Sequence, residues 1–132
     1  MTRYGIDAAT ALRLVGEQSD ADRRHQLVAP SVLRSDVMSM LYREVRAGRI
    51  TEAAGRQQLE TLAGLKIRLL GDRVSRSAAW KIAAGLGWED IAASEYLAVA
   101  SLQADVLVTD DKDLALAAAG LVPVVRYDDL SR

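Results

Sequence analysis

The most informative stretch of the chain is Val106-Leu107-Val108-Thr109-Asp110-Asp111. A short unbroken apolar run is typical of a strand buried on both faces, as in a parallel sheet. The residues that follow, 112–119, have the pattern of a helix. This order predicts a strand, a tight turn and a helix, with the two aspartates at the carboxyl end of the strand.

Working outward from this unit, strands and helices alternate along the chain. We expect the other strands at Arg3–Ile6, 66–70 and 122–125, and the other helices at 8–17, 31–47, 51–63, from 72 onward, and at 90–103. Ser31 and Thr51 are the predicted N-caps of two of these helices. Strands separated by helices imply right-handed crossovers, so the sequence predicts a three-layer α/β domain with a short parallel sheet.

Length and composition predict one domain that spans residues 1–132. Half of the 132 residues are apolar, enough for a single sizeable core. The 17 basic and 18 acidic residues leave a net charge of -1, which implies no overall attraction to nucleic acids or membranes. A polyanionic partner must therefore be held locally. Fourteen of the basic residues are Arg, a bias that suits phosphate contacts but that genome composition also produces.

The chain has no cysteine, which excludes disulfides, thiolate metal sites and cysteine nucleophiles. Its first residues reach a charge before any long apolar run, unlike a signal peptide. The longest stretch without charge, Leu114 to Val125, contains Gly120 and Pro123 and is too short to span a bilayer. We therefore expect a soluble, cytoplasmic protein without a membrane partner.

Four acidic residues are candidate site residues: Asp7, Asp36, Asp90 and Asp111. Asp7 and Asp111 follow predicted strands, and the pocket of a parallel sheet opens at the carboxyl ends of its strands. Asp is also a favoured N-cap, so each of these residues has helix capping as an equal alternative. For Asp90, capping is the default explanation.

Asp36 is the more telling acid because it lies one turn from both Val32 and Met40, on a stripe that is otherwise apolar. A carboxylate there needs hydrogen bonds, a cationic partner or a metal. The alternative is a partly exposed residue paired with Arg43 or Arg73. If the fold gathers the four acids, the result is an oxygen-rich pocket suited to Mg²⁺ or Mn²⁺.

At these residues the chain resembles the PIN-domain ribonucleases, particularly the VapC-like toxins of bacterial toxin-antitoxin pairs. The segment Ile6-Asp7-Ala8 is similar to the first acidic motif of that family, and residues 30–37 resemble the segment of its second acid, normally Glu, where this chain has Asp36. Residues 93–98, Ala-Ser-Glu-Tyr-Leu-Ala, resemble the helix Asp-Ala-Glu-Tyr-Leu-Ala. The stretch from Leu107 to Asp111 resembles a strand that ends in Thr-x-Asp.

The resemblance implies a Mg²⁺- or Mn²⁺-dependent endoribonuclease that acts as the toxin of such a pair. It implies catalytic roles for Asp7, Asp36 and Asp111, with Thr109 and Asp110 near the metal as water-positioning groups. It also implies an RNA substrate, a cognate antitoxin that covers the pocket, and a homodimer. Three apolar residues of the 31–63 segment could serve these interfaces or the core: Met38, Leu59 and Leu62.

The chain departs from the family at the third acid, because Ala93 stands where the family has aspartate. Asp90 lies three residues earlier and, on a continuous helix, would reach toward the site from one turn below, so we expect the metal ligands to be Asp7, Asp90 and Asp111. Glu95 is the weaker substitute because two residues along a helix turn a side chain to another face. The alternative is a catalytically depleted domain that binds RNA or an antitoxin-like protein without cleaving.

Other classes fit less well. An aspartyl phosphotransferase of the Asp-x-Asp type would need an acid at Ala9, and no glycine-rich phosphate loop follows a strand. A receiver-like signalling domain lacks a recognisable central phosphoacceptor strand. We expect the single histidine, His25, to be exposed in a polar connector, and Tyr96 to belong to the core.

Overall fold

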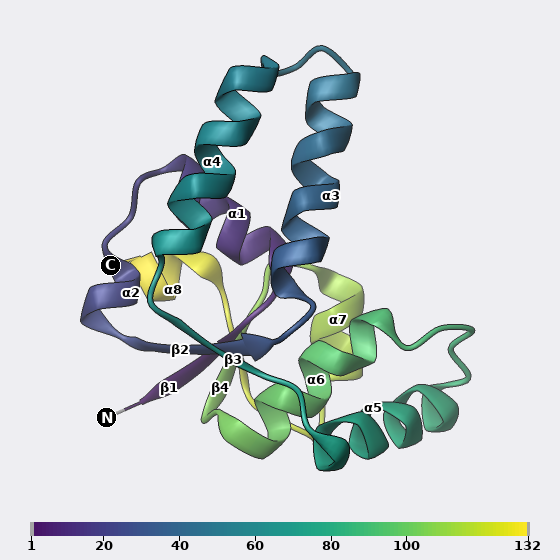
Figure 1. Ribbon diagram of the computed structural model, residues 1–132. Helices are drawn as coiled ribbons and strands as arrows, with labels where there is room; N and C mark the ends of the chain where they lie inside the picture. The colour runs from purple at the N-terminus through teal and green to yellow at the C-terminus, as the bar shows by residue number, and fades with distance from the viewer. Residues whose placement is uncertain (1, 132) are drawn as a thin grey trace.

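In the computed structural model, which describes residues 2–131, five strands form one parallel sheet in the order β3-β2-β1-β4-β5. The strands are β1 (Arg3–Ile6), β2 (Gln26–Pro30), β3 (Ile67–Leu70), β4 (Val106–Val108) and β5 (Val124–Val125). The predicted α/β class and the three-layer arrangement are confirmed, because helices flank both faces of the sheet (Figure 1).

The helices are α1 (Ala8–Gly16), α2 (Ala21–Arg24), α3 (Leu33–Arg46), α4 (Glu52–Gly64), α5 (Arg73–Leu86), α6 (Ala92–Gln103), α7 (Lys112–Ala117) and α8 (Tyr127–Ser131). Figure 1 shows α1 and α4 on one side of the sheet and α5 and α6 on the other. The longest of the helices described in residues 2–131 have 14 residues, and none combines the length and the apolar character needed to cross a bilayer.

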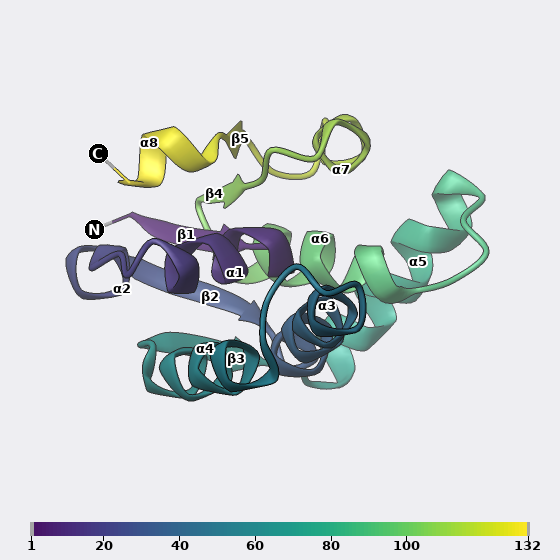
Figure 2. The same cartoon turned by 90° about the horizontal axis from the view of Figure 1, so that it is seen from above.

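The order of the strands reverses at β1. From β1 the chain adds β2 and β3 on one side, and later adds β4 and β5 on the other. In parallel sheets such a reversal leaves a crevice outside the carboxyl ends of the two strands that flank it. Here these strands are β1 and β4, whose registers pair Ile6 with Val108. Figure 2 shows the same polarity for β2, which runs from α2 to α3.

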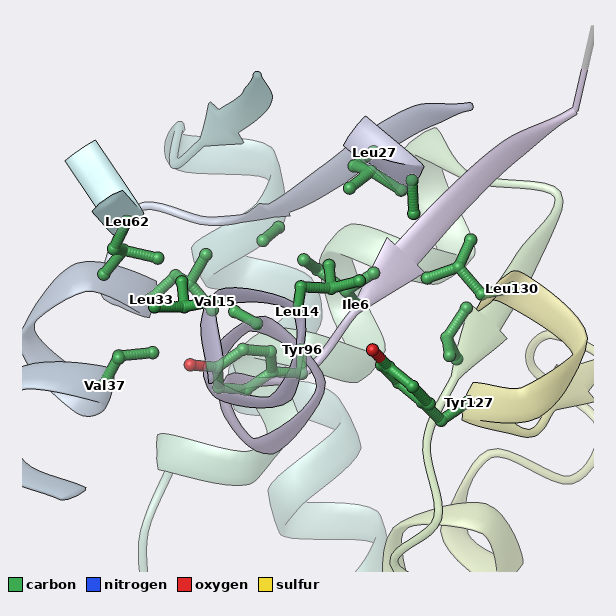
Figure 3. Close-up of a cluster of buried hydrophobic side chains, with 14 of the residues drawn as sticks. Ile6, Leu14, Val15, Leu27, Leu33, Val37, Leu62, Tyr96, Tyr127 and Leu130 are labelled. Carbon is green, nitrogen blue, oxygen red and sulfur yellow. The ribbon is translucent and has the colours of Figure 1, made fainter. Parts of the chain in front are cut away.

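The main core lies between the sheet and the helices α1, α3 and α4. Figure 3 shows side chains from β1, α1, β2, α3, α4, α6 and α8 in this cluster, among them Ile6, Leu33 and Tyr96. A second cluster joins α6 to β4 and α7 and contains Leu97, Leu107 and Leu114. The site described below therefore stands on elements that are anchored in two apolar clusters.

Three short elements lie outside the predicted ones. The segment around His25, expected to be a polar connector, contains α2 and leads into the strand β2, and the residues after β5 form α8. The prediction of Ser31 as an N-cap is wrong: its N–H donates to the Leu70 carbonyl at 2.9 Å, so it continues the contact between β2 and β3, and α3 begins after Val32 without a side-chain cap. Thr51 is confirmed as an N-cap, since its Oγ1 accepts the N–H of Ala54 at 3.1 Å.

Candidate functional site

An open pocket with a volume of about 530 Å³ lies at the carboxyl edge of the sheet. It is lined by residues from the start of α1, from α3, from the start of α6 and from the start of α7. Its acidic lining residues are Asp7, Asp36, Asp111 and Asp113. Three of the four acids singled out in the sequence are thus brought together, although Asp7 and Asp111 are more than a hundred residues apart.

Asp7 stands at the junction of β1 and α1 and is almost buried, with 7% of its surface exposed. Its Oδ1 accepts the N–H of Thr10 at 2.8 Å, so it caps α1. Its Oδ2 accepts the hydroxyl of Thr109 at 2.6 Å. Both predicted roles therefore coexist: the same carboxylate caps a helix and faces the pocket.

Thr109 joins the ends of the two central strands. Its hydroxyl donates to Asp7 and accepts the N–H of Asp111 at 3.0 Å, and the side chain is buried. This pair of bonds uses the donor and an acceptor site of the hydroxyl at once. Thr109 therefore fixes the carboxylate of Asp7 relative to the backbone of Asp111.

Asp36 is half-buried on α3, and its Oδ2 accepts the hydroxyl of Tyr96 on α6 at 2.6 Å. Figure 3 shows the Tyr96 ring within the core with its oxygen directed toward α3, near Val37. Burial, and then the hydrogen bond to the carboxylate of Asp36, raises the pKa of Tyr96 well above its usual range. Tyr96 is a core residue as expected, but no sequence pattern indicated that its hydroxyl reaches Asp36.

The basic partners considered for Asp36 do not pair with it. Arg43 lines the same pocket, but among residues 2–131 no salt bridge joins Asp36 to Arg43 or Arg73. The same holds for Asp7 and Asp111 within the described part of the chain. Among the described residues, the three carboxylates thus share a pocket and none of them forms a salt bridge.

Asp111 caps α7, because its Oδ1 accepts the N–H of Leu114 at 3.0 Å. It is exposed, in contrast to Asp7. Asp113, in the first turn of the same helix, also lines the pocket and was not singled out in the sequence. The run Asp110-Asp111-Lys112-Asp113 was the available signal, since a helix beginning at the pocket edge exposes several residues of its first turn.

Asp90 does not lie in this pocket. The helix expected from residue 90 begins at Ala92, so Asp90 is in the preceding loop, where it is exposed and its Oδ1 accepts the N–H of Ala92 at 3.1 Å. Asp90 was predicted as a metal ligand because it would lie one turn before Ala93 on a continuous helix. Because α6 begins only at Ala92, this geometry is absent. Ala93 itself lines the pocket.

Asp110 faces a different part of the molecule from Asp111. Its Oδ1 accepts the backbone N–H of Tyr127 at 3.1 Å, and its carboxylate lies 3.4 Å from the guanidinium groups of Arg13 and Arg126. These contacts hold the start of α8 against α1 and β4. Asp110 is not among the residues that line the acidic pocket, whereas Thr109 contacts Asp7 directly.

Glu95 is close enough to Asp36 for their charges to interact. Burial raises the pKa of the Glu95 carboxyl, and the negative charge of Asp36 raises it further. The side chain is half-buried but is not a lining residue of the pocket. Of the two substitutes considered for the acid missing at Ala93, Glu95 is thus electrostatically coupled to Asp36, and Asp90 is tied to its own loop.

The donors in the pocket are carboxylate oxygens, which are hard ligands suited to Mg²⁺ or Mn²⁺. Within residues 2–131 no three His, Cys, Asp or Glu side chains stand close enough together to enclose a metal ion. Mg²⁺ commonly binds through one or two carboxylates and completes its coordination with water and substrate phosphate. The arrangement therefore suits a largely hydrated cation better than one enclosed by protein ligands.

No protein-family model and no curated protein matches the chain. Among solved structures, the chain is similar to the crystal structure of PAE2754 from Pyrobaculum aerophilum, with a TM-score of 0.78 and 23% sequence identity. The match covers 98% of this chain and 92% of that chain. At this level of identity the likeness shows the fold alone, and it extends over essentially the whole of both chains.

Proposed function

We propose that the chain is a PIN-like endoribonuclease that hydrolyses RNA with a Mg²⁺ or Mn²⁺ ion and acts as the toxin of a toxin-antitoxin pair. The observation that carries the proposal is the pocket itself: Asp7, Asp36 and Asp111 come from three elements, face one open space and have no salt-bridge partner among residues 2–131. Such a concentration of negative charge is stabilised by a cation.

In this proposal Asp7 and Asp111 hold the cation and Asp36 faces it from the opposite wall. When bound, the ion supplies positive charge that lowers the pKa of a water molecule and offsets charge on the scissile phosphate. The hydroxyl of Thr109 holds one oxygen of Asp7, and that of Tyr96 holds one oxygen of Asp36, so each carboxylate has a fixed orientation. Arg43, an exposed residue of the pocket lining, would contact an RNA phosphate in this proposal.

Hydrolysis of a phosphodiester needs a water oxygen to attack phosphorus as the bond to the leaving oxygen breaks. Burial of Asp7 and the hydrogen bonds of the two carboxylates preorganise the pocket before substrate arrives. The opening at the carboxyl edge leaves room for a polymer chain. These features favour a site for a macromolecular substrate over a closed small-molecule cavity.

A second candidate function is a depleted PIN-like domain that binds RNA or an antitoxin-like protein without cleaving. This alternative is favoured by Ala93, which lines the pocket at the position where the PIN-domain ribonucleases that the chain resembles have their third acid. The loop position of Asp90 also favours it, because that residue does not replace the missing ligand in the described geometry.

The partners belong to the same proposal: RNA as substrate, an antitoxin over the pocket, a second copy of the chain, and a cytoplasmic location. Of the three apolar residues considered for protein contacts, Leu62 is buried in the core and Leu59 is half-buried beside it. Met38 is 51% exposed. Together with Tyr42, which is also exposed, it lines a depression between α3 and α4. This depression is the candidate protein-contact surface.

The proposal is tested by Mn²⁺-dependent cleavage of a pool of structured RNAs. We expect cleavage by the unmodified chain and by the control Glu60→Gln, which changes an exposed acid on α4, and loss of cleavage in Asp7→Asn and Asp111→Asn. Asn keeps the capping ability of Asp at both positions, so the helices persist. Loss of cleavage in Asp90→Asn as well would include Asp90 in the site. A chain that binds these RNAs but cleaves none would instead support the depleted domain.

A further inference from the structure

A second pocket, of about 450 Å³, lies at the amino ends of β1, β2 and β3. Because all strands are parallel, this edge is the one opposite the acidic pocket. Figures 1 and 2 show this edge of the sheet beside α2, where the chain enters β2 and where the N-terminal end of β1 lies. The strand register agrees with this position, because Arg3 of β1 pairs with Gln26 of β2, and Leu27 of β2 pairs with Ile67 of β3.

This basic pocket is lined by five Lys and Arg residues: Arg3, Arg23, Arg24, Lys66 and Arg68. Arg24 forms a salt bridge with Asp20 at 2.8 Å. For the other four, no salt bridge occurs within residues 2–131. A chain of net charge -1 thus gathers nearly a third of its 17 basic residues around one cavity, and like charges held together favour the binding of an anion.

Among the described residues that line the basic pocket, Asp22 is the one acid, and it is already engaged with the backbone. Asp22 is 7% exposed, and its Oδ2 accepts the N–H of Lys66 at 3.0 Å. This bond ties α2 to the start of β3 and so holds two walls of the cavity in place. Asp22 does not form a salt bridge with any of the cations around it in the described part of the chain.

The histidine of the chain also lines the basic pocket. Contrary to expectation, His25 is half-buried; its ring lies edge-on to Tyr4, with centroids 5.0 Å apart. Its Nε2 is buried and has no hydrogen-bond partner within residues 2–131. Buried polar atoms are usually paired with other protein groups or with ordered water, so it is the cavity and its cations that indicate a ligand.

We infer that the basic pocket is a binding site for a small anion that carries adjacent phosphate groups, such as pyrophosphate or the phosphate chain of a nucleotide. Arg supplies paired donors that match phosphate oxygens, and several cations match a multiply charged ligand. The volume is that of a small-molecule site. Acidic residues flank the cavity, with Asp20 beside Arg24 and Asp105 at Arg3, which disfavours a long track for a nucleic-acid backbone.

The inference is tested by calorimetric titration of the full chain with inorganic pyrophosphate in the presence of a metal chelator. We expect binding that weakens about tenfold in Arg68→Gln and in Arg23→Gln, because each change removes a charge-assisted contact. Both side chains are exposed, so neither change disturbs the core. Arg76→Gln, a change of the same type on an exposed part of α5 away from the pocket, is the matched control and should bind as the unmodified chain does.

Two further titrations separate the sources of the phosphate. Tighter binding of a nucleoside triphosphate than of pyrophosphate would assign the site to nucleotides, and equal binding would assign it to the phosphate chain alone. Asp7→Asn should bind both as the unmodified chain does, which separates this site from the proposed nuclease site. No binding of either probe, or equal loss in Arg76→Gln and Arg68→Gln, would overturn the inference. Arg68-dependent binding of a short single-stranded RNA without binding of pyrophosphate would also overturn it.

Discussion

Tyr96 is buried in the core, yet its hydroxyl lies 2.6 Å from a carboxylate oxygen of Asp36 at the pocket. Tyr96→Phe removes this hydrogen bond and keeps the ring. We expect a loss of about 1 kcal/mol in the free energy of unfolding, because Asp36 is only half-buried and water replaces part of the lost interaction. Urea denaturation measures the loss. The control Tyr42→Phe changes a side chain that is 63% exposed and should leave the free energy of unfolding unchanged. Equal stability of the two variants would contradict this role of Tyr96.

Tyr127 gives the fold a dependence on alkaline pH. Burial, followed by a hydrogen bond from its hydroxyl to Glu17, raises its pKa to about 12, although Arg13 opposes the shift. A raised pKa favours the neutral form in the folded state, so this contribution is complete below the ordinary value of 10.0 and is lost as the pH rises toward 12.

We therefore expect Tyr127→Phe to lose stability less steeply than the unmodified chain between these two pH values. Denaturant unfolding at a series of pH values measures the two slopes. Parallel slopes would mean that Tyr127 ionises equally readily in the folded and unfolded chains.

The positions of Asp7 and Asp111 were predictable because Asp7 directly follows β1 and Asp111 lies three residues after β4, and the position of a strand end depends on local pattern. It did not predict the bond between Tyr96 and Asp36, whose partners are 60 residues apart and meet only through the packing of α6 against α3. The neighbours Asp110 and Asp111 differ for a similar reason. Asp111 caps the next helix, a local interaction, whereas Asp110 binds the N–H of Tyr127 on a helix that the sequence pattern had not indicated.

Among the elements, β1 and α6 approach so closely that Gly5 leaves no room for a side chain. A Cβ at this position would lie 2.9 Å from the Cβ of Ala100. Gly5→Ala should therefore lower the free energy of unfolding by about 1–3 kcal/mol through overpacking. In a double-mutant cycle with Ala100→Gly the two costs should be less than additive, since the second change removes the colliding methyl group. Additive costs would show that the strain arises elsewhere.

Thr51 and Ser31 were both predicted as N-caps, and only Thr51 has this role in the structure. Thr51→Ala removes the bond to the N–H of Ala54 and should cost about 1 kcal/mol. Ser31→Ala should leave stability within about 0.5 kcal/mol, because the contact of Ser31 with β3 is made by its backbone and α3 has no side-chain cap. Chemical denaturation of the two variants measures both. A larger loss in the free energy of unfolding for Ser31→Ala than for Thr51→Ala would instead show that Ser31 caps α3, as the sequence predicted.

Helices and strands were predicted best where the pattern is strong, and their ends were predicted less well. The segment from residue 90 was read as helix, but the first turn begins at Ala92 because Asp90 bonds the N–H of Ala92 and closes the preceding loop. Along α5, the large apolar residue Val74 is 62% exposed, and the buried positions are Ser75, Ala79 and Ala83. Small residues mark a close helix contact that a count of large apolar residues does not detect.

At the scale of the molecule, the strand order explains why distant acids meet. The reversal at β1 places β4 beside it, so the residues that follow these strands face one crevice, and α3 delivers Asp36 to the same place. Alternation of strands and helices was enough to predict a parallel sheet. The order β3-β2-β1-β4-β5 was not predicted, because several orders are compatible with the same alternation.

The proposed activity depends on a divalent cation that binds at the carboxyl edge of the sheet. We would add Mn²⁺ to isotope-labelled protein and record the paramagnetic broadening of backbone amide signals by NMR. We expect selective broadening around Asp7, Asp36 and Asp111, which disappears in the double variant Asp7→Asn with Asp111→Asn and persists in Glu60→Gln. Broadening centred elsewhere, or unchanged in the double variant, would contradict it.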